Sequence, residues 1–262
     1  PHQSMIDAHA HLTDQRLHGS VGALLERARG AGVEHLLMAG TEPLDWDRQR
    51  ELAATHPGLS MVFGLHPWWA KDARAVRDGL GRLEEALSQG FAPVAIGETG
   101  LDRSPRHKDT LEHQKVSLLG HLRIALDRDL PVVLHVVRSH GLMLECLRSL
   151  EEVPRGMVHA FDGSLEVARE YQALGLHLSV GGRVCAPSAR RLQRAVVAIR
   201  SERLLIETDA PDQLPHGLNG ELNEPANLVR VAERLAELRG TTLDDIANVT
   251  ASNARRLFRL PD

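Results

Sequence analysis

Short apolar runs alternate along the chain with longer amphipathic segments, a pattern that predicts strands alternating with helices. Eight runs have the length of a buried strand, at 5–11, 33–40, 59–67, 92–100, 130–137, 155–161, 176–182 and 204–211. Stretches such as SVGALLERARGAG and EHQKVSLLGHLRIALDRD lie between them and carry the apolar spacing of helices. Strict alternation implies a parallel sheet, and eight units in 262 residues favour a closed barrel over an open sheet. The predicted fold is therefore an α/β, TIM-type (β/α)8 barrel.

The predicted barrel takes up nearly the whole chain. Residues 1–4 precede the first strand and resemble sequence left by an expression vector, so residues 5–262 are assigned to one domain. The stretch TTLDDIANVTASNARRLF at 241–258 predicts a closing helix, with Thr242 as its N-cap and Asp245 near the capping-box position.

Composition narrows the classes of protein that the chain can belong to. A hydrophobic content of 42% supports a large core, and a net charge of −4 offers no long-range attraction to a polyanion. Cys146 and Cys185 lie far apart in the sequence and outside every candidate ligand motif, as expected of buried thiols in a reducing compartment. No apolar stretch approaches the roughly 18 residues of a membrane span. We expect a cytoplasmic protein without a membrane partner, and infer no obligate protein partner.

Polar residues with metal-binding side chains recur where the predicted strands end. They are His9 and His11 in the first strand, Glu98 in the fourth, His135 in the fifth, His159 in the sixth and Asp209 in the eighth. Period-two geometry in the first strand predicts that Asp7, His9 and His11 all point toward the barrel axis. One such histidine is more often structural than a ligand, but six residues at one end of five strands predict a shared site.

Imidazoles and carboxylates are typical ligands of zinc, manganese or magnesium ions, and the absence of cysteine from the set argues against a closed structural zinc site. Two ions need about seven protein ligand atoms, so one carboxylate must bridge them, and Glu98 is the candidate. We expect a hydroxide between the two ions to act as the nucleophile. Asp209 is the candidate for orienting that nucleophile or accepting its proton.

Other residues near the strand ends have two interpretations each. Asp7 and Glu207 either orient a ligand histidine or form a buried ion pair. Trp68 and Trp69 either stack a nucleobase or form a hydrophobic lid. The cations after strands four, five and seven either contact phosphate or form a solvated rim; they are Arg103, Arg106, His107, Lys108, Arg138 and Arg183. The predicted substrate contacts are Arg103 and Arg138 from this set, together with His66 of the GLHP stretch.

The motifs IDAHAHL, GLHP, IGETGLD, PVVLH, VHAFDGS and ETDAP together resemble the TatD family of metal-dependent nucleases within the amidohydrolase-like barrels. The resemblance extends over nearly the whole chain, including NEPANL at 223–228 and TASNARRLF at the end. It implies that His9, His11, Glu98 and Asp209 surround one ion and that Glu98, His135 and His159 surround the other. It also implies a DNase that depends on magnesium, manganese or zinc and often works from the 3′ end.

Two positions depart from the pattern of this family. Its members usually carry Ser-Arg after the fifth-strand histidine, whereas this chain has Val136, Val137 and then Arg138. Asp212 stands where an aromatic residue often follows ETDAP, which adds negative charge near the substrate mouth. Both changes bear on the identity of the substrate and leave the ligand set intact.

The leading functional prediction is hydrolysis of a phosphodiester, with a nucleic-acid end or a small phosphodiester as substrate and two divalent ions as cofactors. The alternative is an amidohydrolase acting on an amide, lactone or other small acyl substrate, because the same ligands polarise a carbonyl. A catalytically silent binding protein is a third class, but it predicts a missing ligand and none is missing.

Overall fold

The structure is a computed structural model that describes residues 4–261, in which eight parallel strands form one sheet with the order β1 to β8. The strands are β1 (Met5–Ala10), β2 (Val33–Met38), β3 (Leu59–Phe63), β4 (Ala95–Asp102), β5 (Val132–Val137), β6 (Gly156–Val158), β7 (His177–Val180) and β8 (Leu204–Ile206). Of the segment interpreted as vector-derived, residues 1–3 lie outside the described part of the chain.

The sheet closes between its first and last strands. The backbone N–H of Asp209 donates to the carbonyl of His9 over 2.9 Å, and the N–H of His11 donates to the carbonyl of Ala210 over 2.7 Å. These bonds lie just beyond β8, at the carboxyl end of the barrel. The predicted TIM-type barrel is therefore confirmed.

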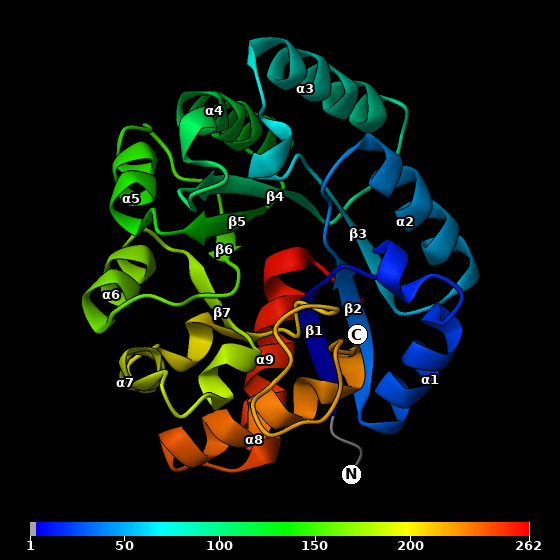
Figure 1. Cartoon of the computed structure of the whole chain (residues 1–262), viewed down its shortest axis with the longest axis vertical. Helices are drawn as coiled ribbons and strands as arrows, with labels where there is room; N and C mark the ends of the chain where they lie inside the picture. The colour runs from blue at the N-terminus through cyan, green and yellow to red at the C-terminus, as the bar shows by residue number, and fades with distance from the viewer. Residues whose placement is uncertain (1–3, 262) are drawn as a thin grey trace.

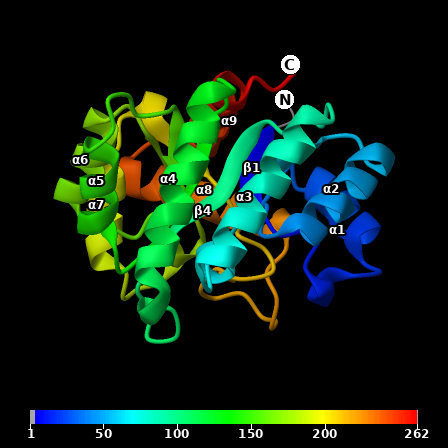
Figure 2. The same cartoon turned by 90° about the horizontal axis from the view of Figure 1, so that it is seen from above.

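Helices surround the strands as a ring (Figure 1). Within residues 4–261 they are α1 (Val21–Gly30), α2 (Pro43–Thr55), α3 (Ala73–Ser88), α4 (Leu111–Asp127), α5 (His140–Arg148), α6 (Leu165–Ala173), α7 (Arg190–Val197), α8 (Leu228–Arg239) and α9 (Leu243–Phe258). In Figure 2 helix α9 lies on the side of the molecule opposite the orange loop that follows β8. None of these helices is long and apolar enough to cross a membrane.

The ends of several helices follow from local chemistry. The Asp72 carboxylate accepts the N–H of Ala75 over 2.8 Å and so caps the start of α3. Gly240 ends α8 with a φ of 64°, a left-handed conformation that glycine adopts without a steric penalty. Thr242 and Asp245 form the predicted capping box at the start of α9. These caps separate α8 from α9 within three residues.

Two buried clusters divide the core. The larger one fills the space between the strands and the surrounding helices. The smaller one takes inward-facing residues from seven strands and packs them against α9; these are Ile6, Ala8, Leu37, Val62, Ala95, Val133, Met157 and Leu205. Because α9 covers the amino-terminal end of the barrel, the open end is the one where the carboxyl ends of the strands meet.

The prediction that Asp7, His9 and His11 all point toward the barrel axis is wrong for Asp7. Ile6 and Ala8 face the barrel interior, and the pairing of β1 with β2 shifts register between Asp7 and Ala10. This irregularity turns His9 inward as well, because one extra residue interrupts the period of two. Asp7 instead accepts hydrogen bonds from the backbone N–H and the hydroxyl of Thr208 beside β8.

Candidate metal centre

The six predicted ligands come together at the open end of the barrel, although their places on the strands vary. Glu98 lies in the middle of β4, which continues to Asp102, and His135 lies two residues before the end of β5. His11 and His159 directly follow β1 and β6, and Asp209 lies three residues beyond β8. Because the strands differ in length, side chains at these different positions still lie at the same height along the barrel axis.

Glu98 lies at the centre of the cluster, buried to 1% exposure. Its Oε1 atom is 2.6 Å from His135 Nδ1, 2.9 Å from His159 Nε2 and 3.3 Å from His66 Nε2. The Oε2 atom is 3.2 Å from His9 Nε2 and 3.5 Å from His11 Nε2. One carboxylate is therefore shared between two groups of imidazoles.

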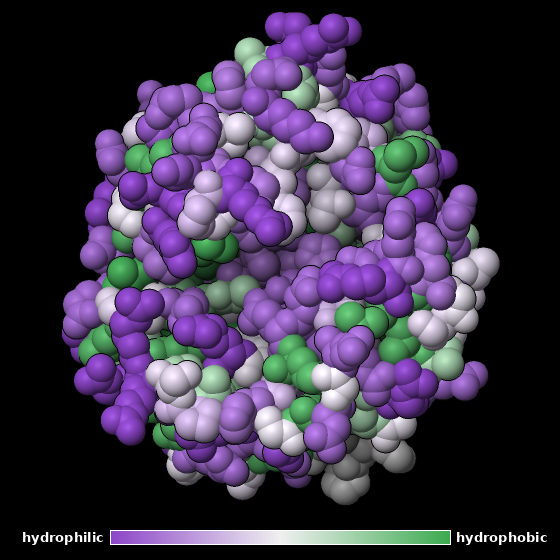
Figure 3. All heavy atoms as spheres, in the orientation of Figure 1, coloured by the Kyte–Doolittle hydropathy of each residue, from purple (hydrophilic) through white to green (hydrophobic). Residues whose placement is uncertain are grey.

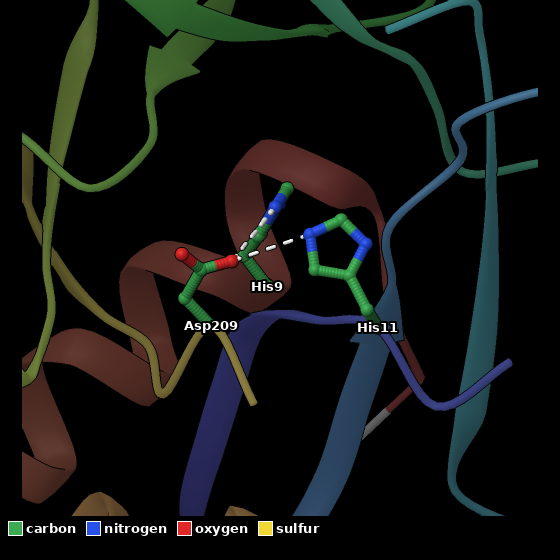
Figure 4. A group of neighbouring side chains, drawn as sticks. All are labelled: His9, His11 and Asp209. Atoms are coloured by element: carbon green, nitrogen blue, oxygen red, sulfur yellow. Dashed lines mark ion pairs between the residues drawn. The ribbon is translucent and has the colours of Figure 1, made fainter. Parts of the chain in front are cut away.

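His9, His11 and Asp209 form the group on the Oε2 side (Figure 4). Asp209 Oδ1 lies 3.2 Å from His11 Nε2 and 3.7 Å from His9 Nε2, while Oδ2 accepts a 2.7 Å hydrogen bond from the Gln213 amide. Asp209 has a φ of 56°, a strained value for a residue other than glycine. Its backbone bond to His9 holds it in that conformation.

Three sets of ligand atoms each lie within 4.8 Å of one another: His9, His11 and Asp209; His9, Glu98 and His159; and His66, Glu98 and His135. His66 is a substrate contact in the prediction from the sequence, but its position also allows it to bind a metal beside Glu98. His66 further accepts the backbone N–H of Trp68 at Nδ1 over 3.2 Å, so its ring is oriented by its own loop.

Carboxylates behind the cluster hold two of the imidazoles. Glu207 Oε1 lies 3.2 Å from His159 Nδ1 and accepts the N–H of Ala160 over 2.7 Å. Asp102 Oδ2 lies 3.5 Å from His135 Nε2. The orienting interpretation therefore suits Glu207, whereas Asp7 contacts the backbone of His9 and not its ring. Asp102 was missed, although it ends the IGETGLD motif, four residues after Glu98.

Buried polar atoms without hydrogen bonds identify what the cluster can bind. Within residues 4–261, His9 Nε2 and Glu98 Oε2 lie out of contact with solvent and have no hydrogen-bond partner. Such groups are costly to bury unless something satisfies them. A divalent cation accepts electron pairs from imidazole nitrogens and carboxylate oxygens together, so these residues fit a metal ion.

The protonation of the cluster shows how strongly its charges interact. Burial opposes ionisation of Glu98, but the neighbouring His159, His66 and His9 hold its pKa well below the usual range. Burial likewise opposes a charge on His11, yet its hydrogen bond with Asp209 and the charge of Glu98 raise its pKa to about 9. Burial lowers the pKa of His66 to about 4.

A cavity of about 530 Å³ opens above the cluster. Figure 3 shows a hollow at the centre of this face with hydrophilic side chains around it. The cavity is lined by His11, Asp14, Arg16, Thr41, Glu42, His66, Trp68, Trp69, Lys71, Glu98, His135, His159, Asp209 and Asp212. The predicted substrate contacts divide here, because His66 lines the cavity whereas Arg103 and Arg138 are exposed residues outside that lining.

Arg16 and Lys71 line the cavity and were missed by the sequence analysis, because neither stands next to a ligand strand motif. Arg16 is paired with Asp212 over 2.9 Å and with Asp14 over 2.9 Å. Asp212, one of the departures noted above, thus has a cation as its partner. These contacts join the loop after β1 to the loop after β8 at the edge of the cavity.

Comparison with known proteins agrees with this geometry. The family model described as TatD related DNase matches residues 6–259. The chain is 34% identical to the uncharacterized metal-dependent hydrolase YabD of Bacillus subtilis, covering 98% of this chain and 99% of that protein. It is 33% identical to the 3′-5′ ssDNA/RNA exonuclease TatD of Citrobacter rodentium, covering 97% of each. The crystal structure of the TatD homologue YjjV from Escherichia coli superposes with a TM-score of 0.91 at 35% identity, covering 98% of both chains.

Proposed function

Because the chain belongs to the TatD-related DNase family of metal-dependent hydrolases, we propose that it removes nucleotides from the 3′ end of single-stranded nucleic acid. The observation that carries this proposal is the shared position of Glu98 between two groups of histidines, at the floor of an open cavity. A centre of this kind suits hydrolysis of a phosphodiester, in which both the attacking and the leaving oxygen need stabilisation.

We propose that the centre binds two divalent ions, with zinc, manganese or magnesium as the candidates. His9, His11, Glu98 and Asp209 would hold one ion, and Glu98, His135 and His159 would hold the other. The imidazole nitrogens that face each oxygen of Glu98 support this assignment. When bound, the ions supply Lewis-acid polarisation of a phosphoryl oxygen and lower the pKa of water.

The side chains of the chain itself position substrate and move protons. Asp209 keeps its pKa below the usual range, since burial is outweighed by its hydrogen bond and charge interaction with His11, so it is ionised at neutral pH. We assign it the role of accepting the proton of the attacking water at Oδ1, because Gln213 occupies Oδ2. Glu207 and Asp102 keep the rings of His159 and His135 in place.

We assign substrate contacts to three residues at different distances from the centre. His66 lies 3.3 Å from Glu98 and is neutral near pH 7, since burial lowers its pKa to about 4, so its ring can exchange a hydrogen bond with a phosphate oxygen or a ligand water. Arg103 and Arg138 are exposed and would contact only phosphates that extend beyond the cavity. Cys146 and Cys185 are free thiols, although they are only partly buried and not fully buried as expected; free thiols suit a reducing compartment such as the cytoplasm.

The test compares substrate classes on metal-reconstituted protein. Single-stranded DNA and RNA labelled at either end, a generic phosphodiester and a panel of amide and lactone substrates are incubated in parallel, with Glu98→Ala as the blank. We expect stepwise shortening from the 3′ end that is absent from the blank. Turnover of an acyl substrate without any cleavage of nucleic acid would overturn the proposal in favour of an amidohydrolase.

A further inference from the structure

Trp68 is an exposed aromatic residue at the edge of the cavity. It lies in the short 3-10 helix Pro67–Trp69 between β3 and α3, and 53% of its surface is exposed. The other large exposed hydrophobic residues within the described chain are aliphatic: Leu44, Val116, Leu119, Val197 and Leu222. Trp68 differs from them in presenting an aromatic ring to the lining of the cavity.

The indole ring is held in a fixed orientation. Its Nε1–H donates a 2.7 Å hydrogen bond to Asp102 Oδ2, the carboxylate oxygen that also lies 3.5 Å from His135 Nε2. The ring of His107 stacks on it with a centroid distance of 4.6 Å and an interplanar angle of 15°. His66 contacts it nearly edge-on, at 4.6 Å and 70°. Trp68 is therefore both exposed and rigidly linked to the metal centre.

Part of the Trp68 side chain is open to the cavity. Trp68 lines the cavity with 53% of its surface exposed, and His107, which stacks on the ring, does not line it. The stacked His107 also shows that a flat aromatic ring packs well on this indole. A nucleobase is a flat ring of the same kind, and stacking on an aromatic side chain tolerates any base.

Lys71 adds a positive charge on the same loop. It lines the cavity, is exposed, and its side chain makes no hydrogen bond or ion pair with residues 4–261. Arg16, which also lines the cavity, is already paired with Asp14 and Asp212. Lys71 is thus the cation at the edge of the cavity whose charge is left to interact with a ligand.

We infer that the loop between β3 and α3 forms a nucleotide subsite, in which Trp68 stacks the base and Lys71 binds the phosphate of the same or the adjacent nucleotide. This inference rests on the proposed function and adds to it how the substrate end is recognised. Stacking gives affinity without base preference, as a nuclease that proceeds through any sequence requires. The lid interpretation of Trp68 differs, because a lid would give no preference for a ligand that carries a base.

The test measures binding of a nucleotide that needs no hydrolysis. Calorimetric titration of the metal-reconstituted protein compares 2′-deoxyadenosine 5′-monophosphate with 2-deoxyribose 5-phosphate, which has the same phosphate but no base. We expect the nucleotide to bind about 5-fold to about 150-fold more tightly, which corresponds to the stacking of one base at about 1–3 kcal/mol.

Two variants at the same position separate stacking from the hydrogen bond to Asp102. Trp68→Phe and Trp68→Leu both lose Nε1, but only the first keeps an aromatic face. The ratio of the affinity for the nucleotide to the affinity for 2-deoxyribose 5-phosphate should largely persist in Trp68→Phe. It should fall to nearly one in Trp68→Leu. Because Trp68 is mostly exposed, both variants should fold, which circular dichroism checks. An unchanged preference in Trp68→Leu, or none in the wild type, would overturn the stacking role.

Lys71→Met tests the phosphate contact independently. It should weaken the binding of both ligands by a similar factor, since both carry the phosphate, and leave the ratio of the two affinities unchanged. Unchanged affinity for both ligands would refute the role of Lys71. The proposed function is judged separately by cleavage of labelled DNA. If DNA is not cleaved but the nucleotide preference is present and depends on Trp68, the subsite stands and the nuclease proposal fails.

Discussion

Replacing Asp209 with Asn should lower turnover by about 10²–10⁴-fold, while metal bound at Glu98, His135 and His159 is retained. Asp209 Oδ1 lies 3.2 Å from His11 Nε2, and its Oδ2 accepts a hydrogen bond from Gln213. Asn preserves the shape and one oxygen donor but cannot accept a proton. Its amide must also direct its NH₂ group either toward Gln213 or toward the histidines, which disturbs one of the two contacts.

The expected loss corresponds to about 2.7–5.5 kcal/mol of transition-state stabilisation, the usual contribution of a general base. The ionised state of Asp209 supports this role, because its lowered pKa keeps the carboxylate available at neutral pH. If Asp209 only bound metal, its replacement would lower turnover and metal content in proportion.

Metal content by mass spectrometry and turnover at saturating single-stranded DNA are therefore measured on the same preparations. Gln213→Leu serves as the matched control, because it removes the hydrogen bond to Oδ2 and leaves the Asp209 carboxylate in place. We expect a much smaller loss of turnover in this control than in Asp209→Asn. Near wild-type turnover in Asp209→Asn with its full metal content would refute the role of Asp209 as base and direct attention to His66.

Three further predictions concern the bridge, the protons and the backbone of the site. Glu98→Gln should lower the affinity for both metal ions together, since one carboxylate faces both histidine groups; metal titration that shows selective loss of one ion would contradict a bridge. Metal affinity should rise from about pH 6 to about pH 9. An imidazole must be neutral to bind a metal ion, and the pKa values of His11, His135 and His159 are raised, so protons compete with the metal over this range. A metal affinity that stays flat over this range in calorimetry would refute this prediction. Gly64→Ala should sharply lower the thermal midpoint of unfolding and the metal affinity, because a Cβ there would lie 2.4 Å from the backbone carbon of Gly97, next to Glu98; unchanged values for both would show that the backbone can yield.

The sequence by itself determined the barrel and the residue types of the metal centre. Eight apolar runs separated by amphipathic segments leave few alternatives to a parallel barrel, because both periods are local and repeat along the whole chain. His9, His11, Glu98, His135, His159 and Asp209 could be chosen because strand ends in a parallel barrel meet at one face, so that a position along the chain predicts a position in space.

Only the tertiary structure decided the orientation and the surroundings of these residues. The register shift in β1 turns His9 inward and Asp7 toward Thr208, a result of pairing with neighbouring strands that the sequence of β1 does not contain. His66 joins Glu98 and His135 across three strands, and no spacing of residues predicts that contact.

The loops show the same division most clearly. The sequence favoured Arg103 and Arg138 at the substrate mouth because they follow ligand strands, yet the cations that line the cavity are Arg16 and Lys71. Apart from the register shift in β1, strand faces follow a local period that can be counted in the sequence. The path of a loop depends on contacts between distant segments, such as Arg16 with Asp212 and Trp68 with Asp102, which form only when the barrel closes and brings its ends together.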